Sequence, residues 1–343
     1  MLLDLNIISP IPEISLSRYL QKLKKFKLNY HHDLGGGLNF AGESWFNQSG
    51  LNCYWTTIGY PLDSQRLNVL PPLDFIVTAT TGLTHIDLAV AKDKEIEIVS
   101  LLNEHLFLSR ITATPEHTWA LVLSVWRKIF MAGSLPSFQP LTRESFMSRQ
   151  LSGKSIGFIG FGRVGKQVSK YATAFGMDIY AYDKYASFSD DNEFKHVNFV
   201  QDIKEIAHNS DITVVAASVI AQDSHQYPLV NEAYVSSARP GSIIINTARG
   251  ILVDEESILN GVKSGHLFGA GFDVLSTEDI SSKQATKANI PIMLYKAKEQ
   301  GYNVVVTPHI AGMCSDAFDL AMNFVSNKLL DKLNEKFSAK EYD

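Results

Sequence analysis

The chain has 343 residues, of which 45% are hydrophobic and 20% charged, and its formal net charge is -5. This length predicts two domains of ordinary size, and the acidic balance argues against a nucleic-acid partner. No apolar run approaches the roughly 18 residues of a membrane span, and no basic segment precedes the first apolar residues, so we expect a cytoplasmic protein that does not enter a membrane. Cys53 and Cys314 stand far apart without ligand spacing, and we predict neither a disulfide nor a metal site.

The first third of the chain alternates short apolar runs with helical segments. We predict strands at residues 5–10, 27–32, 73–80 and 96–101. The basic run Lys22–Lys27 is typical of the solvated face of a short helix, and the three glycines at 35–37 are typical of a loop. These elements predict a small α/β unit.

Residues 114–133 predict a helix that carries the chain from one domain to the other. Thr114 is the expected N-cap, Pro115 the first helical residue and Gly133 the stop. We interpret its Trp and Leu side chains as core.

From Ser155 onward the alternation predicts a second, larger α/β unit. Strands are expected at residues 155–160, 178–183, 211–217, 242–248, 269–274 and 303–309, with helical segments between them. This order is typical of a parallel, doubly wound Rossmann-type sheet with crossover helices. An amphipathic helix is expected over 313–333.

A glycine-rich loop follows the first strand of that unit and opens a helix. Its GxGxxG spacing comes from Gly160, Gly162 and Gly165. The first glycine permits a sharp turn, the second lets the backbone approach a pyrophosphate, and the third lets helix and strand pack closely. Glycines also close turns for structural reasons alone, but the strand-loop-helix context favours a dinucleotide site.

Asp183 ends the next predicted strand, where a carboxylate accepts hydrogen bonds from the adenosine ribose hydroxyls. Its charge would repel a 2'-phosphate, so we predict NAD as the cofactor. Lys184 and Tyr185 leave open how strictly NADP is excluded. The alternative is an ordinary turn residue at a strand end.

Polar side chains follow three later strands, at the sheet edge where α/β proteins bind ligands. They are Arg249, Asp273 with Glu278, and His309. Taken singly, each has a simpler interpretation: a surface ion pair for Arg249, a loop charge for Glu278 and a hydrogen-bonded core histidine for His309.

Five segments together resemble the D-isomer-specific 2-hydroxyacid dehydrogenases, a family that includes phosphoglycerate, glycerate and D-lactate dehydrogenases. These segments are LDFIVTATTGLTHID, ITATPEHTWAL, LSGKSIGFIGFGRVG, GSIIINTARGILVDE and NVVVTPHIAG. The resemblance implies an NAD-binding Rossmann domain at 113–308 and a flavodoxin-like α/β substrate domain formed by 1–112 and 309–343. It also implies a homodimer joined through the coenzyme domain.

The match implies catalytic roles for three residues. Arg249 would clamp the substrate carboxylate, His309 would be the acid/base, and Glu278 would support its imidazole. The chemistry suits these residue types, because a guanidinium fork matches a carboxylate, and a histidine can exchange a proton near neutral pH. A carboxylate on the other ring nitrogen fixes the tautomer.

The same match implies binding roles for further residues. Arg163, Val164 and Ala248 would join the glycines and Asp183 in holding NAD, with Asp273 near the nicotinamide carboxamide. The backbone amides of Thr81 and Gly82 would meet the substrate carboxylate.

The sequence departs from the family pattern at two places. Ala216 and Ser218 stand where a histidine and a proline often do, and Glu278 is followed by Asp279 in place of proline. A long polar insertion at 280–302 then precedes the histidine strand, so the shape of the site is expected to differ.

We therefore predict an NAD-dependent oxidoreductase that interconverts a D-2-hydroxy acid and its 2-oxo acid. The alternative is a non-catalytic NADH-sensing scaffold, as in the C-terminal-binding corepressors, which resemble the same family and can retain equivalent residues. Formate dehydrogenase is disfavoured because its reaction releases no hydroxyl proton. The identity of the hydroxy acid stays open.

Overall fold

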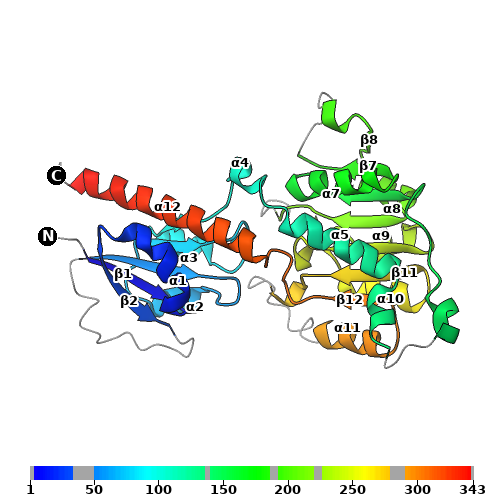
Figure 1. Ribbon diagram of the computed structural model, residues 1–343, viewed down its shortest axis with the longest axis horizontal. Coiled ribbons are helices and arrows are strands. Elements are labelled where there is room, and N and C mark those ends of the chain that lie inside the picture. The colour runs from blue at the N-terminus through cyan, green and yellow to red at the C-terminus, as the bar shows by residue number, and fades with distance from the viewer. Residues whose placement is uncertain are drawn as a thin grey trace. The chain divides into compact units, whose positions relative to one another are not determined.

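The computed structural model describes residues 4–33, 50–135, 140–185, 192–219, 226–278 and 290–340. The chain forms two compact units, Met1–Leu108 with Ser315–Asp343, and Ser109–Cys314 (Figure 1). His309 therefore belongs to the same unit as the glycine-rich loop. The roles of the two units, substrate and coenzyme, stay a prediction. The glycine run at 35–37 and Asp279 lie outside the described residues.

The first unit contains a five-stranded parallel sheet in the order β2-β1-β3-β4-β5. Its strands are β1 (Asp4–Ser9), β2 (Lys27–His32), β3 (Leu51–Thr56), β4 (Phe75–Thr78) and β5 (Glu97–Val99). Sequence analysis missed β3, whose six residues are all buried. Its polar Asn52 is satisfied inside by Asn6 Nδ2, at 2.9 Å, and by the Asp74 carboxylate, at 2.8 Å from its N–H.

Helices cover both faces of this sheet. They are α1 (Glu13–Leu20), α2 (Ser64–Val69), α3 (Leu88–Asp93), α4 (His105–Leu108) and α12 (Ser315–Lys340). The final helix, α12, lies beside α1 and packs on β4 and β5 (Figure 1). In the sequence, the whole second unit separates it from the rest of the first unit. The predicted last helix thus begins at Ser315 and continues to Lys340. The basic run Lys22–Lys27 does not form the predicted helix, because a 3-10 turn at Gln21–Leu23 leads directly to β2.

The second unit contains a seven-stranded parallel sheet in the order β12-β11-β10-β9-β6-β7-β8. The strands are β6 (Ser155–Ile159), β7 (Asp178–Tyr182), β8 (Val197–Phe199), β9 (Ile212–Val215), β10 (Ser242–Asn246), β11 (Leu267–Phe272) and β12 (Val304–Val306). The chain builds outward from β6 to β8 and then crosses back to β9 beside β6. This reversal is the doubly wound order, so the predicted α/β class is confirmed.

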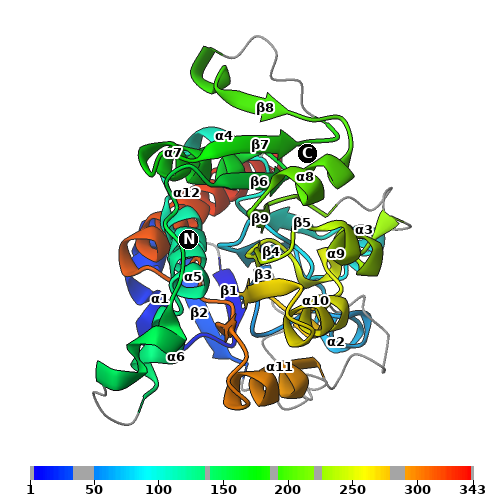
Figure 2. The ribbon, with the colours of Figure 1, turned by 90° about the vertical axis from the view of Figure 1, so that its right-hand side faces the viewer.

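Helices also flank this sheet on both sides (Figure 2). The segments are α5 (Ala113–Trp126), α6 (Ile129–Gly133), α7 (Arg163–Ala174), α8 (Ile203–Asn209), α9 (Glu232–Ser237), α10 (Glu255–Lys263) and α11 (Ile290–Glu299). Helices α5 and α7 pack on one face, and α8 to α10 on the other. Neighbouring strand residues alternate between the two cores, as Phe158 and Ile159 do. Within the described ranges, no helix is both long and apolar enough to cross a bilayer.

The predicted helix at 114–133 is interrupted. Lys128 has φ 52°, a left-handed conformation that ends α5 and separates it from α6. The N-cap position is Thr112 and not Thr114, and the Thr112 hydroxyl donates to Glu116 Oε1 at 2.5 Å. The expected core role of the tryptophans is confirmed, since Trp126 is fully buried.

Candidate active site

The glycine-rich loop joins β6 to α7, and its three glycines meet different surroundings. Gly160 has φ +90°, and a Cβ there would lie 2.5 Å from the backbone of Ala217. A Cβ at Gly165 would lie 2.8 Å from the Gly160 carbonyl oxygen, whereas one at Gly162 would meet nothing within 4 Å. The first and third glycines are thus required by the fold, and the second leaves open space at the loop, as a bound pyrophosphate needs.

The N-terminus of α7 faces that loop with unpaired donors. Among the described residues, the backbone N–H groups of Arg163, Val164 and Gly165 have no partner, as is usual for a first helical turn. These groups and the helix dipole favour an anion. The Arg163 guanidinium donates to the Ile111 carbonyl at 3.0 Å, and burial lowers its pKa. The geometry of the loop therefore fits a dinucleotide.

Asp183 follows β7 and reaches back to the glycine-rich loop. Its Oδ2 accepts from the Phe161 N–H at 2.8 Å, and its Oδ1 accepts from the Tyr185 N–H at 2.9 Å. The carboxylate is therefore fixed at the loop. Lys184 points its Nζ to Gln226 Oε1, at 3.2 Å.

Arg249 lies on a turn just beyond β10. Buried Asn246 holds this turn, because its Nδ2 donates to the Arg249 carbonyl and its Oδ1 accepts from the Ala248 N–H, each at 3.0 Å. The Arg249 guanidinium donates to the Ala248 carbonyl at 2.6 Å. Sequence analysis missed Asn246, although a polar residue at the end of an Ile-rich strand is a usable signal.

The structure brings Glu278 and His309 together. Glu278 Oε2 lies 2.5 Å from His309 Nδ1, and its Oε1 accepts from the Leu275 N–H at 2.7 Å. The side chains are 34% and 25% exposed, so solvent and small molecules can reach the pair. His309 has φ 54°, a left-handed conformation that is unfavourable for residues other than glycine.

Asp273 explains how this conformation is held. It is fully buried at the end of β11, and its carboxylate accepts from the Thr307 hydroxyl at 2.6 Å and from the N–H groups of Ile310 and Ala311, each at 2.9 Å. The His309 N–H donates to the Asp273 carbonyl at 2.9 Å. The segment on both sides of His309 is thus tied to one residue.

The ionised form of Asp273 is stabilised despite its burial. Burial acts to raise its pKa, but hydrogen bonds outweigh this effect, so that the pKa lies below its ordinary value. The donors are His117, Thr307, Ala311 and Ile310. The predicted contact of Asp273 with a nicotinamide carboxamide stays a prediction.

His117 was not among the predicted site residues. It lies on α5, and its Nε2 is 3.0 Å from the Thr307 hydroxyl and 3.4 Å from Asp273 Oδ1. A histidine on an otherwise apolar helix was the available signal, but its partners are remote in sequence.

Thr81 and Gly82 lie in the first unit, on the loop after β4. The Thr80 hydroxyl donates to the Gly82 carbonyl at 2.9 Å. In the part of the chain that the structure describes, the N–H groups of Thr81 and Gly82 have no partner. They remain available to an anionic ligand.

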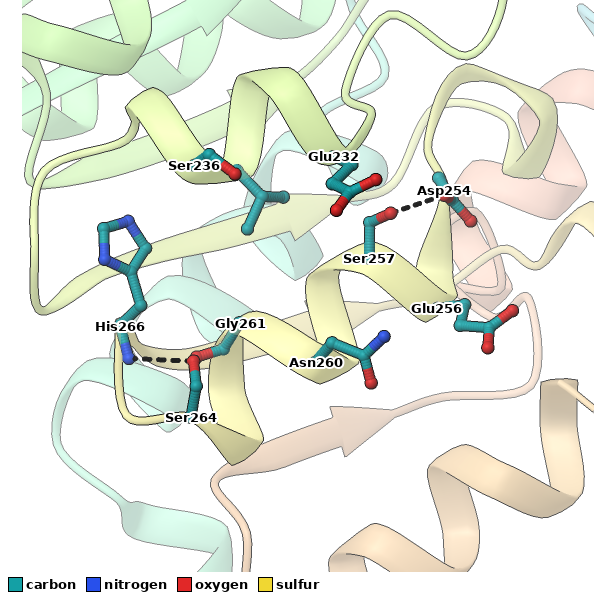
Figure 3. A pocket seen from close by; sticks show the side chains of 10 residues that line it. Glu232, Ser236, Asp254, Glu256, Ser257, Asn260, Gly261, Ser264 and His266 are labelled. Carbon is teal, nitrogen blue, oxygen red and sulfur yellow. Dashed lines mark hydrogen bonds between the residues drawn. The ribbon is translucent and has the colours of Figure 1, made fainter.

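A surface groove of about 670 Å³ lies elsewhere in the second unit, between α9 and α10 (Figure 3). Glu232, Asp254 and Glu256 project into it, with Ser257 donating to the Asp254 carboxylate at 2.6 Å. None of the predicted site residues lines this groove. We therefore place the candidate site at the strand ends.

Comparison with known proteins supports the same region. Residues 119–311 match the family model of the D-isomer specific 2-hydroxyacid dehydrogenase, NAD binding domain. This match confirms NAD as the predicted cofactor at the level of the family.

Named relatives vary in length and activity. D-3-phosphoglycerate dehydrogenase of Mycobacterium leprae is 29% identical over 264 residues, 76% of this chain and 45% of that protein. The chain thus aligns with less than half the length of that relative. Hydroxypyruvate reductase of Thermotoga maritima is 30% identical over 245 residues, 71% and 72% of the two chains.

A solved structure agrees in fold. D-lactate dehydrogenase from Aquifex aeolicus, complexed with NAD and lactic acid, matches with a TM-score of 0.75 and 22% identity, over 97% of this chain and 96% of that one.

Proposed function

Because the chain belongs to the D-isomer-specific 2-hydroxyacid dehydrogenase family, we propose that it interconverts a D-2-hydroxy acid and its 2-oxo acid with NAD. The observation that carries the proposal is the 2.5 Å pair of Glu278 and His309, in the same unit as the glycine-rich loop. A reaction that moves a hydride to or from an alcohol carbon also needs a group that exchanges the hydroxyl proton.

NAD, when bound, accepts or supplies the hydride. The chain's own part is proton transfer, since Nδ1 of His309 faces Glu278 and Nε2 is left to take the hydroxyl proton in oxidation or return it in reduction. The Glu278 carboxylate holds the orientation of the ring.

The substrate carboxylate requires donors. We assign Arg249 to this role, because two parallel N–H bonds from a guanidinium suit a carboxylate. The predicted contact of the Thr81 and Gly82 amides with the substrate carboxylate stays a proposal. Arg163, Val164, Gly165, Asp183 and Ala248 are the chain's proposed contacts to the dinucleotide.

The test is loss of NADH absorbance with a panel of 2-oxo acids that includes glyoxylate, pyruvate, hydroxypyruvate and 3-phosphohydroxypyruvate. His309→Gln should lower kcat by a factor on the order of 100 to 10,000 with little change in NADH affinity. His208→Gln, at an exposed position on α8, is the matched control and should behave as wild type.

Two outcomes would contradict the proposal. Full turnover in His309→Gln would remove this residue from the mechanism. NADH binding without turnover of any 2-oxo acid would instead favour the NADH-sensing scaffold. The expected homodimer and the expected cytoplasmic location remain proposals. Analytical sedimentation of the purified protein would test the first, and cell fractionation would test the second.

A further inference from the structure

Glu255 is a buried carboxylate that the proposed mechanism does not use. It is the first residue of α10 and is 1% exposed. Its neighbours on the helix, Asp254 and Glu256, face the surface groove (Figure 3). A buried carboxylate needs partners, because desolvation of an unpaired charge is costly.

Ser276 bonds to both oxygens of Glu255. Oε1 accepts from the Ser276 N–H at 2.6 Å, and Oε2 accepts from the Ser276 hydroxyl at 3.0 Å. Ser276 is itself 1% exposed. It opens the 3-10 turn η7 (Ser276–Glu278), whose last residue is Glu278.

The turn η7 is also packed closely against Gly250. A Cβ at Gly250 would lie 2.0 Å from the Leu275 carbonyl carbon and 2.1 Å from the Ser276 nitrogen. Only glycine allows this approach, which packs the turn after Arg249 directly against the turn that carries Glu278.

Among the residues that the structure describes, two groups hold the Glu278 carboxylate. Its Oε1 accepts from Leu275, which lies within the same turn, and its Oε2 meets His309. The turn as a whole must therefore be anchored from outside if the carboxylate is to stay against the imidazole.

We propose that Glu255 is a positioning residue for the reaction, which anchors η7 through Ser276 and so holds Glu278 against His309. This role rests on the proposed function. Glu255 touches neither His309 nor any reacting atom, and it acts through the geometry of the turn. What the role requires is an acceptor of the right reach; charge alone does not suffice.

The reach and the charge can be separated by substitution. Glu255→Asp keeps the charge at the helix N-terminus but shortens the side chain by one methylene, and Glu255→Ala removes the carboxylate. Both should lower kcat by roughly 10- to 100-fold, because a small misplacement of a catalytic group has effects of this order. NADH affinity should stay within about twofold, since the glycine-rich loop is untouched.

Glu255→Gln is the conservative rescue. Its amide oxygen accepts from the Ser276 N–H, and its NH2 donates to the hydroxyl, which can rotate to accept. Turnover should therefore stay within about threefold of wild type. Glu256→Ala, at the adjacent exposed position, should leave turnover unchanged.

A double-mutant cycle tests whether Glu255 acts through Glu278. In the Glu278→Gln background, Glu255→Ala should change kcat by less than about threefold, because residues that act as a unit are strongly non-additive. A general loss of structure would instead multiply with the first effect. If Glu255→Ala does not fold, Glu255→Asp takes its place in the cycle.

The outcomes separate the two proposals. Loss of kcat in Glu278→Gln but not in Glu255→Ala or Glu255→Asp overturns only the role of Glu255, and so does an additive cycle. Unchanged kcat in Glu278→Gln removes Glu278 from the proposed mechanism and overturns the role of Glu255 with it, whereas NADH binding without turnover of any 2-oxo acid by the wild type overturns the proposed function.

Discussion

Replacement of Asp273 by asparagine tests how the segment around His309 is held. The two side chains have the same shape, but asparagine exchanges one acceptor oxygen for an NH2 donor. If the amide oxygen takes the Oδ1 position, it keeps the bonds from Thr307 and Ile310. Its NH2 then faces the N–H of Ala311, 2.9 Å away in the native protein.

The cost follows from these contacts. One bond to a charged acceptor is lost, about 1.5–3 kcal/mol, and a buried N–H is left unpaired, about 1–3 kcal/mol. We expect a total loss of about 3–5 kcal/mol from the second unit, which should lower its Tm by several degrees. With the Ala311 bond lost, the segment that holds His309 at φ 54° should loosen, and kcat should fall more than NADH affinity.

The assay is thermal unfolding followed by circular dichroism, with kcat and NADH affinity measured on the same preparations. Asp202→Asn is the matched control, because Asp202 also accepts backbone N–H bonds but is an exposed N-cap, where asparagine is equally good. Equal Tm values for Asp273→Asn and Asp202→Asn would refute the reasoning.

The remaining predictions concern pH, backbone strain and cofactor choice. The pKa of Asp273 lies below its ordinary value of 3.8, so the stabilising effect of its carboxylate is complete above pH 3.8 and is lost as the pH falls through the lowered pKa. The Tm difference between wild type and Asp273→Asn should therefore shrink in that acid range and stay constant from about pH 5 to 7. The His309→Gly variant should have a free energy of unfolding up to about 1 kcal/mol higher than His309→Ala, since relief of the left-handed strain outweighs the greater freedom of unfolded glycine. At Asn260, inside α10, the alanine variant should instead be the more stable one. Urea unfolding that gives the same order at both positions would contradict the strain at His309. Asp183→Ser should lower kcat/KM for NAD by about tenfold or more and shrink the preference over NADP, because it removes both the ribose acceptor and the repulsion of a 2'-phosphate; an unchanged ratio of kcat/KM values would show that Asp183 does not reach the ribose.

Much of the fold could be predicted because strands such as β6 and β10 are buried on both faces and therefore form continuous apolar runs. Two strands were not predicted, β3 and the short β8. Strand β3 contains Asn52, Cys53 and Thr56, and its burial depends on Asn6 of β1 and on Asp74, which directly precedes β4. Polar residues satisfied by distant partners leave no periodic signal in a single sequence.

Some residues of the candidate site could likewise be predicted from the sequence, and others could not. Arg249, Glu278 and His309 could be named because each follows a strand and matches a family motif. His117 and Glu255 could not, because their partners are remote in the chain; Thr307 lies 190 residues from His117. Asn246 holds a local turn, so its signal was present in the sequence but was not used. Direct contacts of a reacting group follow from motifs, whereas the groups that hold it in place require coordinates.

The discontinuous first unit also sets an order of events during synthesis on the ribosome. Its sheet comes early in the chain, but α12 is made only after the second unit. This helix packs on β4 and β5 and pairs Lys328 with Glu104 and Lys336 with Asp74. The second unit is continuous and complete before Ser315 leaves the exit tunnel. We expect the nascent chain to fold its second unit before α12 has been synthesised, and to leave the part of the earlier sheet that α12 covers exposed until then. A ribosome stalled near Cys314 would therefore display a half-covered sheet, which is a target for chaperones and an aggregation hazard.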